Sequence, residues 1–140
     1  MATTTVRDVM TKDPVAMSSD ASVAEAAKAM SDLRIGTVVV MEQDKPCGIV
    51  TDRDITVRAV ATGGDPSTIR LADICTRDIA AVRPDQSVGD AIQLMKSRDI
   101  KRLVVMTDSK LEGIVSLGDL AARGEDADVE DDISRAEPNN

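Results

Sequence analysis

Apolar residues recur at intervals of three and four positions in two segments, and this spacing predicts two amphipathic helices. The segments span residues 23–30 and 88–95, and in each of them one helix face is apolar. Ser22 and Ser87 stand just before the segments, each followed three residues later by an acid. This serine-to-acid spacing is typical of a capping box, so we expect both helices to begin there.

Two short apolar runs, at 37–41 and 103–106, predict β-strands. Turn-forming residues follow each run, Gln43-Asp44-Lys45 after the first and Asp108-Ser109-Lys110 after the second, so each strand should fold back onto another. Further short strands are expected around Val15 and Ala80, and further helices from Thr51 to about Ala61 and from Ser116.

The same order of elements occurs twice because the sequence repeats itself at an offset of 65 residues. Residues 6–55 align with 71–120 without a gap, and GIVTDRDI at 48–55 corresponds to GIVSLGDL at 113–120. Each copy reads β-α-β-β-α, so the fold class is α/β (α+β). One copy is too small to cover its own sheet, and duplication supplies the missing core.

The repeat divides the chain into three parts, with a first repeat over 1–65, a second over 66–123 and a tail over 124–140. The tail holds seven acids and one arginine, and it is poor in large apolar residues. We therefore expect it to be disordered.

Composition narrows the possible partners. The net charge is -8, of which the tail carries -6, so residues 1–123 are close to neutral and can still hold a local basic pocket for a small anion. The chain contains no Phe, Tyr or Trp. It therefore lacks an aromatic stacking platform for single-stranded nucleic acid, and we expect no nucleic-acid partner.

The sequence lacks residues or segments that several classes of protein function require. No apolar run is long enough for a membrane span, and residues 1–10 do not resemble a secretory signal, so a cytoplasmic protein is expected. There is no histidine and no P-loop, so we expect neither an enzyme nor a metal site. Two cysteines, Cys47 and Cys75, make neither a disulfide framework nor a zinc site, and we expect them to be inert.

The repeated motif ends in Thr51-x-x-Asp54 and Ser116-x-x-Asp119, which allow two interpretations. A hydroxyl followed three residues later by an acid caps a helix, which stabilises it by about 1 kcal/mol. The same helix start favours anions, and a carboxylate there can accept two hydrogen bonds from a sugar diol. Gly48 and Gly113, just before, would allow either a tight turn or close approach of a ligand to the backbone.

The doubled unit resembles a tandem pair of CBS domains, named after cystathionine β-synthase and together called a Bateman module. The resemblance covers residues 6–121 and depends on the Gly-hydrophobe-x-Ser/Thr-x-x-Asp motif of both copies and on their element order. TDRDI at 51–55 and the later Gly64-Asp65-Pro66 further resemble small two-domain proteins of the hypoxic-response type. The family implies pseudo-two-fold packing of the repeats, with two clefts that each use residues of both repeats.

By this resemblance, the ligands are adenosine derivatives such as AMP, ADP, ATP or S-adenosylmethionine, and no other cofactor is required. The aspartate is expected to bind the ribose, the Ser/Thr to lie near ribose or phosphate, and apolar residues of the other repeat to enclose the adenine. One cleft would use Ile49, Thr51 and Asp54 with Ile79, Ala80, Ile100, Lys101 and Arg102. The second cleft would use Ile114, Ser116 and Asp119 with Pro14, Val15, Ile35, Gly36 and Thr37.

The two clefts are expected to be unequal. Lys101 and Arg102 stand where the family often places a phosphate contact, whereas Gly36 and Thr37 carry no charge. The Asp54 cleft should therefore bind phosphorylated adenosine more tightly. The resemblance implies a regulatory homodimer that senses the ligand and modulates a partner protein, and the alternative is a structural or interaction scaffold whose clefts stay empty.

Overall fold

The structure, a computed structural model, describes residues 4–123 and divides them into two compact units. The first-repeat unit comprises residues 14–78. The second-repeat unit combines residues 4–13 with residues 79–123. The acidic tail, for which we expected disorder, lies outside the described residues.

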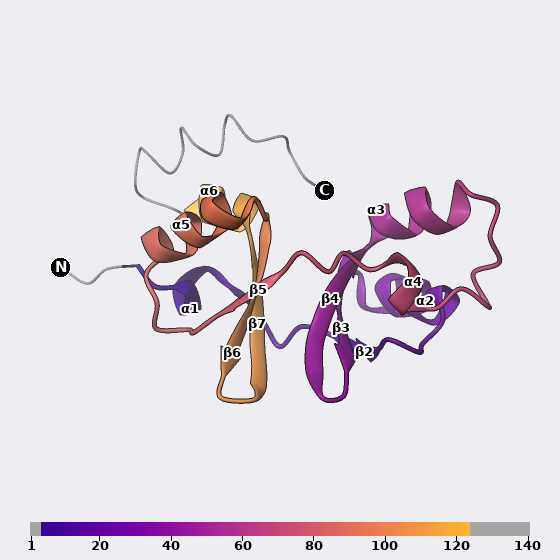
Figure 1. Cartoon of the computed structure of the whole chain (residues 1–140), viewed down its shortest axis with the longest axis horizontal. Helices are drawn as coiled ribbons and strands as arrows, with labels where there is room; N and C mark the ends of the chain where they lie inside the picture. Colours follow the sequence, from indigo (N-terminus) through magenta and orange to yellow (C-terminus); the bar gives the residue numbers. More distant parts are fainter. Residues whose placement is uncertain (1–3, 124–140) are drawn as a thin grey trace. The chain divides into compact units, whose positions relative to one another are not determined.

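The first-repeat unit contains a three-stranded sheet with its helices on one face (Figure 1). In the strand order β2-β3-β4, β2 runs parallel to β3, and β3 and β4 form an antiparallel hairpin. The elements are β2 (Ala16–Ser18), α2 (Val23–Leu33), β3 (Thr37–Glu42), β4 (Lys45–Thr51), α3 (Asp52–Ile55), the π-helix η1 (Thr56–Val60) and α4 (Leu71–Ile74).

The second-repeat unit repeats this arrangement with one more strand, in the order β1-β7-β6-β5. Here β5 is parallel to β6, the pair β6 and β7 is an antiparallel hairpin, and β1 is antiparallel to β7. The elements are α1 (Val6–Val9), β1 (Thr11–Lys12), β5 (Ala80–Val82), α5 (Val88–Arg98), β6 (Arg102–Thr107), β7 (Lys110–Ser116) and α6 (Leu117–Arg123).

The expected helix starts and hairpin turns are present. Ser22 and Ser87 accept hydrogen bonds from the N–H groups three residues later, at 3.1 and 3.0 Å. Gln43 and Asp44, which connect β3 to β4, have φ angles of 52° and 64°. Two left-handed residues give a hairpin turn whose twist matches that of the strands. No helix in residues 4–123 has the length and apolar character that crossing a membrane requires.

The compact units differ from the sequence repeats 1–65 and 66–123, because the opening helix of each repeat packs in the unit formed by the other repeat. Val6 and Val9 of α1 belong to the core of the second-repeat unit, whereas Leu71 and Ile74 of α4 belong to the core of the first-repeat unit. Each sheet is therefore covered by two helices of its own repeat and by the opening helix of the other.

The segment that follows each opening helix then pairs with the last strand of the unit it has joined. Thr76 exchanges two backbone hydrogen bonds of 2.9 Å with Ile49, and the equivalent Thr11 pairs with Ile114. Gly48 and Gly113 lie beside these crossings, inside β4 and β7. A Cβ on Gly48 would stand 2.7 Å from the Thr76 carbonyl oxygen. The glycines therefore allow another backbone segment of the chain to lie close to the strand, and they do not form turns.

Candidate functional site

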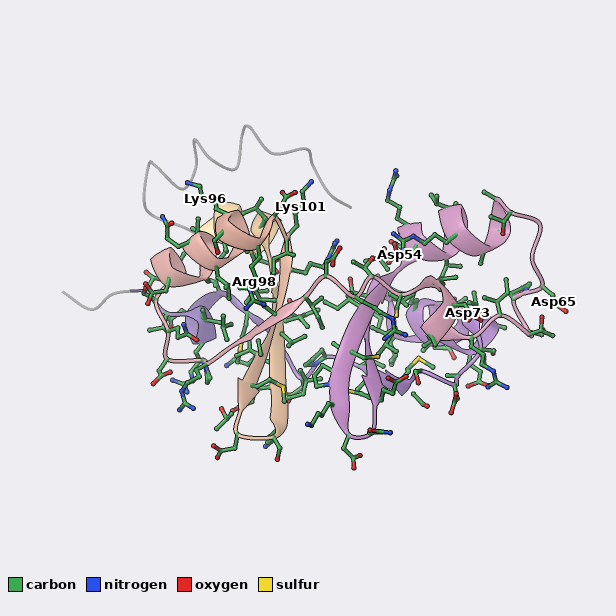
Figure 2. All side chains as sticks on the ribbon, viewed as in Figure 1. Asp54, Asp65, Asp73, Lys96, Arg98 and Lys101 are labelled. Atoms are coloured by element: carbon green, nitrogen blue, oxygen red, sulfur yellow. The ribbon has the colours of Figure 1, made fainter. Side chains whose placement is uncertain are left out.

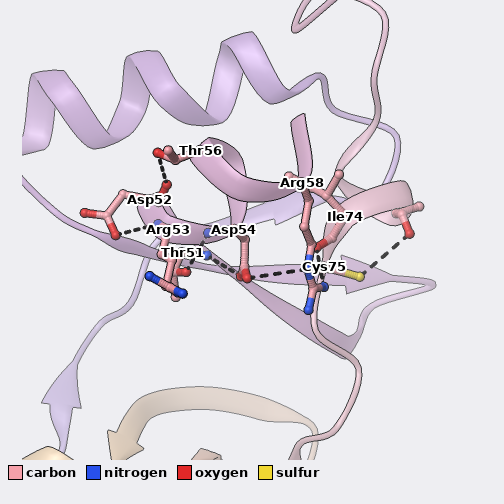
Figure 3. Close-up of polar contacts among 9 residues, drawn as sticks. Thr51, Asp52, Arg53, Asp54, Thr56, Arg58, Ile74 and Cys75 are labelled. Carbon is pink, nitrogen blue, oxygen red and sulfur yellow. Dashed lines mark hydrogen bonds and ion pairs between the residues drawn. The ribbon is translucent and has the colours of Figure 1, made fainter. Parts of the chain in front are cut away.

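The repeated motif forms a strand-to-helix corner in each unit. In the first-repeat unit β4 ends at Thr51, which is 4% exposed and caps α3. The Thr51 hydroxyl accepts a hydrogen bond from the Asp54 N–H at 3.1 Å, and Asp54 Oδ2 accepts one from the Thr51 N–H at 2.9 Å. Figure 3 shows both residues at the first turn of this helix.

The second-repeat unit has the same corner at the end of β7. The Asp119 N–H donates to the Ser116 hydroxyl at 3.0 Å, and the Ser116 N–H donates to Asp119 Oδ2 at 3.0 Å. The capping interpretation is therefore confirmed for both motifs. Each cap uses only one carboxylate oxygen, and because a carboxylate has two oxygens that accept hydrogen bonds, capping does not prevent ligand binding.

The start of a neighbouring strand lies against each corner. The Asp52 N–H donates to the Gly36 carbonyl at 3.0 Å, and the Leu117 N–H donates to the Lys101 carbonyl at 2.9 Å. In register, Thr37 stands opposite Thr51, and Arg102 stands opposite Ser116.

The two corners differ in charge. In the second-repeat unit the strand start carries two basic residues, Lys101 and Arg102, and Figure 2 labels Lys101. In the first-repeat unit the equivalent residues are uncharged, and the Asp52 carboxylate lies close to Gly36, with Oδ2 3.2 Å from where a Cβ would be. Lys101 and Arg102 thus lie beside the Ser116–Asp119 corner of their own unit, and their expected contribution to the Asp54 cleft stays a prediction.

The apolar candidates lie on the strands or just before them. Ile49, which is 1% exposed, is on β4, and Ile114 is on β7. Val15 and Ile35 pack against the core of the first-repeat unit, while Ala80 packs against that of the second and Ile100 is part of it. Two candidates, Pro14 and Ile79, are the first residues of the segments that lead into β2 and β5.

Each expected cleft thus draws one part of its residues from the first-repeat unit and the other part from the second-repeat unit. The first-repeat unit holds the Asp54 corner and the apolar group of the other cleft, and the second-repeat unit holds the Asp119 corner and the remaining candidates. The joining of these halves across the two units, which the family resemblance implies, stays a prediction.

Arg58 lies against the corner aspartate, although its sequence position was not among the candidates. Its Nε lies 3.9 Å from Asp54 Oδ1, and its guanidinium donates to the Ile74 carbonyl at 3.0 Å (Figure 3). Arg58 therefore connects the corner aspartate to the end of α4. The signal was present in the sequence, because Arg58 stands four residues after Asp54, and acid–base pairs at this spacing meet on a helix.

The helix after the Asp54 corner also changes its geometry within one turn. From Thr56 to Val60 it is π-helical, and the Ala61 N–H bonds to the Thr56 carbonyl at 2.8 Å. Such wide turns occur mostly as single turns inside α-helices, and they are frequent at functional sites. Nothing in the apolar spacing of the sequence indicated it.

Comparisons with known proteins agree with this arrangement. The family model for the CBS domain matches residues 6–60 and 71–126. The CBS domain-containing protein YhcV of Bacillus subtilis is 37% identical over 116 residues, which cover 83% of this chain and 82% of that protein. Hypoxic response protein 1 of Mycobacterium tuberculosis is 29% identical over 119 residues, which cover 84% of this chain and 83% of that protein.

Among solved structures, the hexameric CBS-CP12 protein from bloom-forming cyanobacteria superposes with a TM-score of 0.77 at 29% identity. The match covers 96% of this chain and 84% of that one. Together with the two family matches, one per repeat, this shows that the chain belongs to the CBS-domain family and carries two CBS domains in tandem.

Proposed function

We propose that this protein is a regulatory module that binds adenosine derivatives, of the type of AMP, ADP, ATP or S-adenosylmethionine, and modulates a partner protein. CBS-domain proteins are generally regulatory and ligand-binding. The observation that carries the proposal is the duplicated corner, in which a helix start, a buried or half-buried hydroxyl and an aspartate recur in both repeats. A helix start favours a phosphate, and the carboxylate suits a ribose diol.

The mechanism follows from differential affinity. A ligand held by one corner and by residues of the other repeat would favour the packing of the repeats in which both contacts are made. The ligand can shift the equilibrium between the two packings by at most the difference in its binding free energy for them. A partner protein that distinguishes those packings would then respond to the ligand.

We expect Asp54→Asn to abolish most of the thermal stabilisation that a saturating adenosine ligand gives at this corner. Asparagine keeps an oxygen that can cap the helix, but it loses the charge and one of the two acceptors. The measurement is the melting temperature against concentration for AMP, ADP, ATP and S-adenosylmethionine, since a ligand that binds only the folded state stabilises it in proportion to the logarithm of its concentration.

The chain offers a matched control in Asp73→Asn. Asp73 Oδ2 accepts from the Arg70 N–H at 3.1 Å at the start of α4, which is the carboxylate half of the same kind of cap, and Figure 2 labels Asp73. This variant should leave the ligand-dependent increase in melting temperature intact. Equal losses of that increase in Asp54→Asn and Asp73→Asn would contradict a binding role for Asp54.

Arg102→Ala should weaken binding of AMP or ATP about tenfold or more, because a charged hydrogen bond to phosphate contributes about 1.5–3 kcal/mol. Calorimetric titration measures the affinity. Arg98→Ala, at an exposed position in the last turn of α5, removes the same charge from the same unit and should leave the affinity unchanged. An unchanged affinity in Arg102→Ala means that this residue is not a phosphate contact.

Double variants identify the corner that Arg102 serves. If it completes the Asp54 cleft, its removal should have little further effect in an Asp54→Asn background and its full effect in an Asp119→Asn background. The reverse pattern would assign Arg102 to Ser116, its neighbour in its own unit.

The alternative function is a structural or interaction scaffold, and the two confirmed caps favour it because capping alone accounts for both motifs. A melting temperature that no adenosine derivative changes would support the scaffold. In either case we propose that the chain is not itself an enzyme, because its sequence has no histidine and no P-loop. Nucleotide hydrolysis above the buffer rate would refute this.

A further inference from the structure

The only two cysteines of the chain are brought into one core, although they are 28 positions apart in the sequence. Cys75 follows α4, is 8% exposed and belongs to the core of the first-repeat unit. Cys47 is on β4, is partly buried and packs against the same core. The backbone pairing of Ile49 with Thr76 fixes these two segments side by side.

A β-bulge in the hairpin determines how Cys47 is presented. Val40 pairs with Gly48 and Met41 pairs with Pro46, which leaves Cys47 as the extra residue of β4. A bulge interrupts the regular alternation of side chains between the two faces of a sheet. The bulge therefore explains why Cys47 and the next residue, Gly48, both face the same core.

Gly48, the residue directly after Cys47, lies against the side chain of Cys75. A Cβ on Gly48 would stand 3.0 Å from the Sγ atom and 3.3 Å from the Cβ atom of Cys75. Any larger residue would put a side chain there. Gly48 instead lets the strand that carries Cys47 approach Cys75 directly.

The two thiols differ in reactivity. Burial raises the pKa of the Cys75 thiol, and the nearby Cys47 and Glu42 act in the same direction, whereas the Arg77 cation lowers it in part. Cys75 is therefore mainly protonated at neutral pH and is a poor first target, because the thiolate is the reactive form. Cys47, the more exposed of the two, is the thiol that an oxidant reaches first.

We propose that Cys47 and Cys75 form a reversible thiol–disulfide pair inside the first-repeat unit. A peroxide oxidises the Cys47 thiol to a sulfenic acid and is itself reduced to water or an alcohol. The Cys75 sulfur then attacks the Cys47 sulfur, the S–S bond forms, and the sulfenic oxygen leaves as water with the proton of the Cys75 thiol. A dithiol reductant reverses the reaction by exchange.

Formation of the disulfide would affect Asp54 through Ile74 and Arg58. Cys75 directly follows Ile74, whose carbonyl accepts from Arg58, and Arg58 lies against Asp54 (Figure 3). Drawing Cys75 towards Cys47 would displace that carbonyl and change the charge that Asp54 faces. This second step rests on the proposed function, whereas the disulfide itself does not.

The test treats the reduced full-length protein with hydrogen peroxide, blocks the remaining thiols and maps its peptides by mass spectrometry. We expect both thiols to disappear together, with a cross-linked peptide that contains residues 47 and 75 and is restored to two thiols by dithiothreitol. Cys47→Ala should leave Cys75 largely unreacted over the same time. Separate oxidation of the two cysteines to sulfinic acids, or cross-linking between chains, would overturn the proposal.

A second arm separates this inference from the proposed function. The nucleotide-dependent rise in melting temperature is measured before and after oxidation, with Cys47→Ala as the control that cannot form the bond. A changed response in the wild type alone supports coupling to Asp54, and an equal response in both forms refutes it. If the reduced protein does not respond to any nucleotide, the proposed function fails while the peptide map still decides the disulfide.

Discussion

Replacing Leu71 with alanine should lower the free energy of unfolding by about 2–5 kcal/mol, although this residue belongs to the second repeat and stabilises the unit built by the first. Leu71 is fully buried, and it is in the core of the first-repeat unit. Removing its side chain takes away apolar contacts and leaves a cavity that rigid neighbours fill incompletely. Urea denaturation followed by circular dichroism measures the change.

Leu33→Ala is the matched control, because Leu33 is 56% exposed at the end of α2 in the same unit. Its loss should change the free energy of unfolding by no more than about 0.5 kcal/mol. If the two variants were equally stable, α4 would not be part of the core, and the exchange of opening helices between repeats would be wrong.

Gly48→Ala and Gly113→Ala should each destabilise the protein by about 1–3 kcal/mol, because neither position has room for a methyl group. In Gly48 the new Cβ would stand 2.7 Å from the Thr76 carbonyl oxygen, and in Gly113 it would stand 2.8 Å from that of Thr11. These are backbone atoms held by pairing, so the strands must separate to admit the methyl group. The same denaturation experiment measures both variants.

Gly89→Ala should change the free energy of unfolding in the opposite direction. This glycine is exposed in α5, and the nearest atom to its Cβ position is the Ser87 hydroxyl oxygen at 3.8 Å. Alanine favours the helix, so stability should rise by up to about 1 kcal/mol. A loss of stability in Gly89→Ala as large as in Gly48→Ala would show that the effect comes from losing any glycine, not from the crossing.

The elements of each repeat were predictable because their signals are local. Ser22 and Ser87 mark helix starts by spacing alone, and the turn residues at 43–44 fix a hairpin within a few positions. The two corners were predictable for the same reason, since Thr51 and Asp54 are three residues apart. The arginine at 58 follows the same short-range logic.

The exchange of opening helices could not be predicted from such signals. Leu71 meets partners that lie far away in the sequence, and the two repeats offer sheets of nearly the same pattern, so periodicity does not indicate which sheet it covers. The glycines gave the one sequence signal of a close approach to the strands. By sequence, Gly48 and Gly113 indicate a turn or the close approach of a ligand, whereas in the structure each lies against the backbone of a crossing segment. The π-helical turn after Ile55 depends on packing and left no pattern either.

Because each core contains a helix from the other repeat, cleavage of the backbone between the repeats has a specific expected outcome. A protease that cleaves near residue 65 would produce two fragments, each of which holds the β-hairpin of one unit and the opening helix of the other. Neither fragment could fold by itself without exposing apolar surface, yet the two together contain every piece of both cores. A nick at this position should therefore leave the fragments associated, and fragments produced separately should complement each other only when mixed.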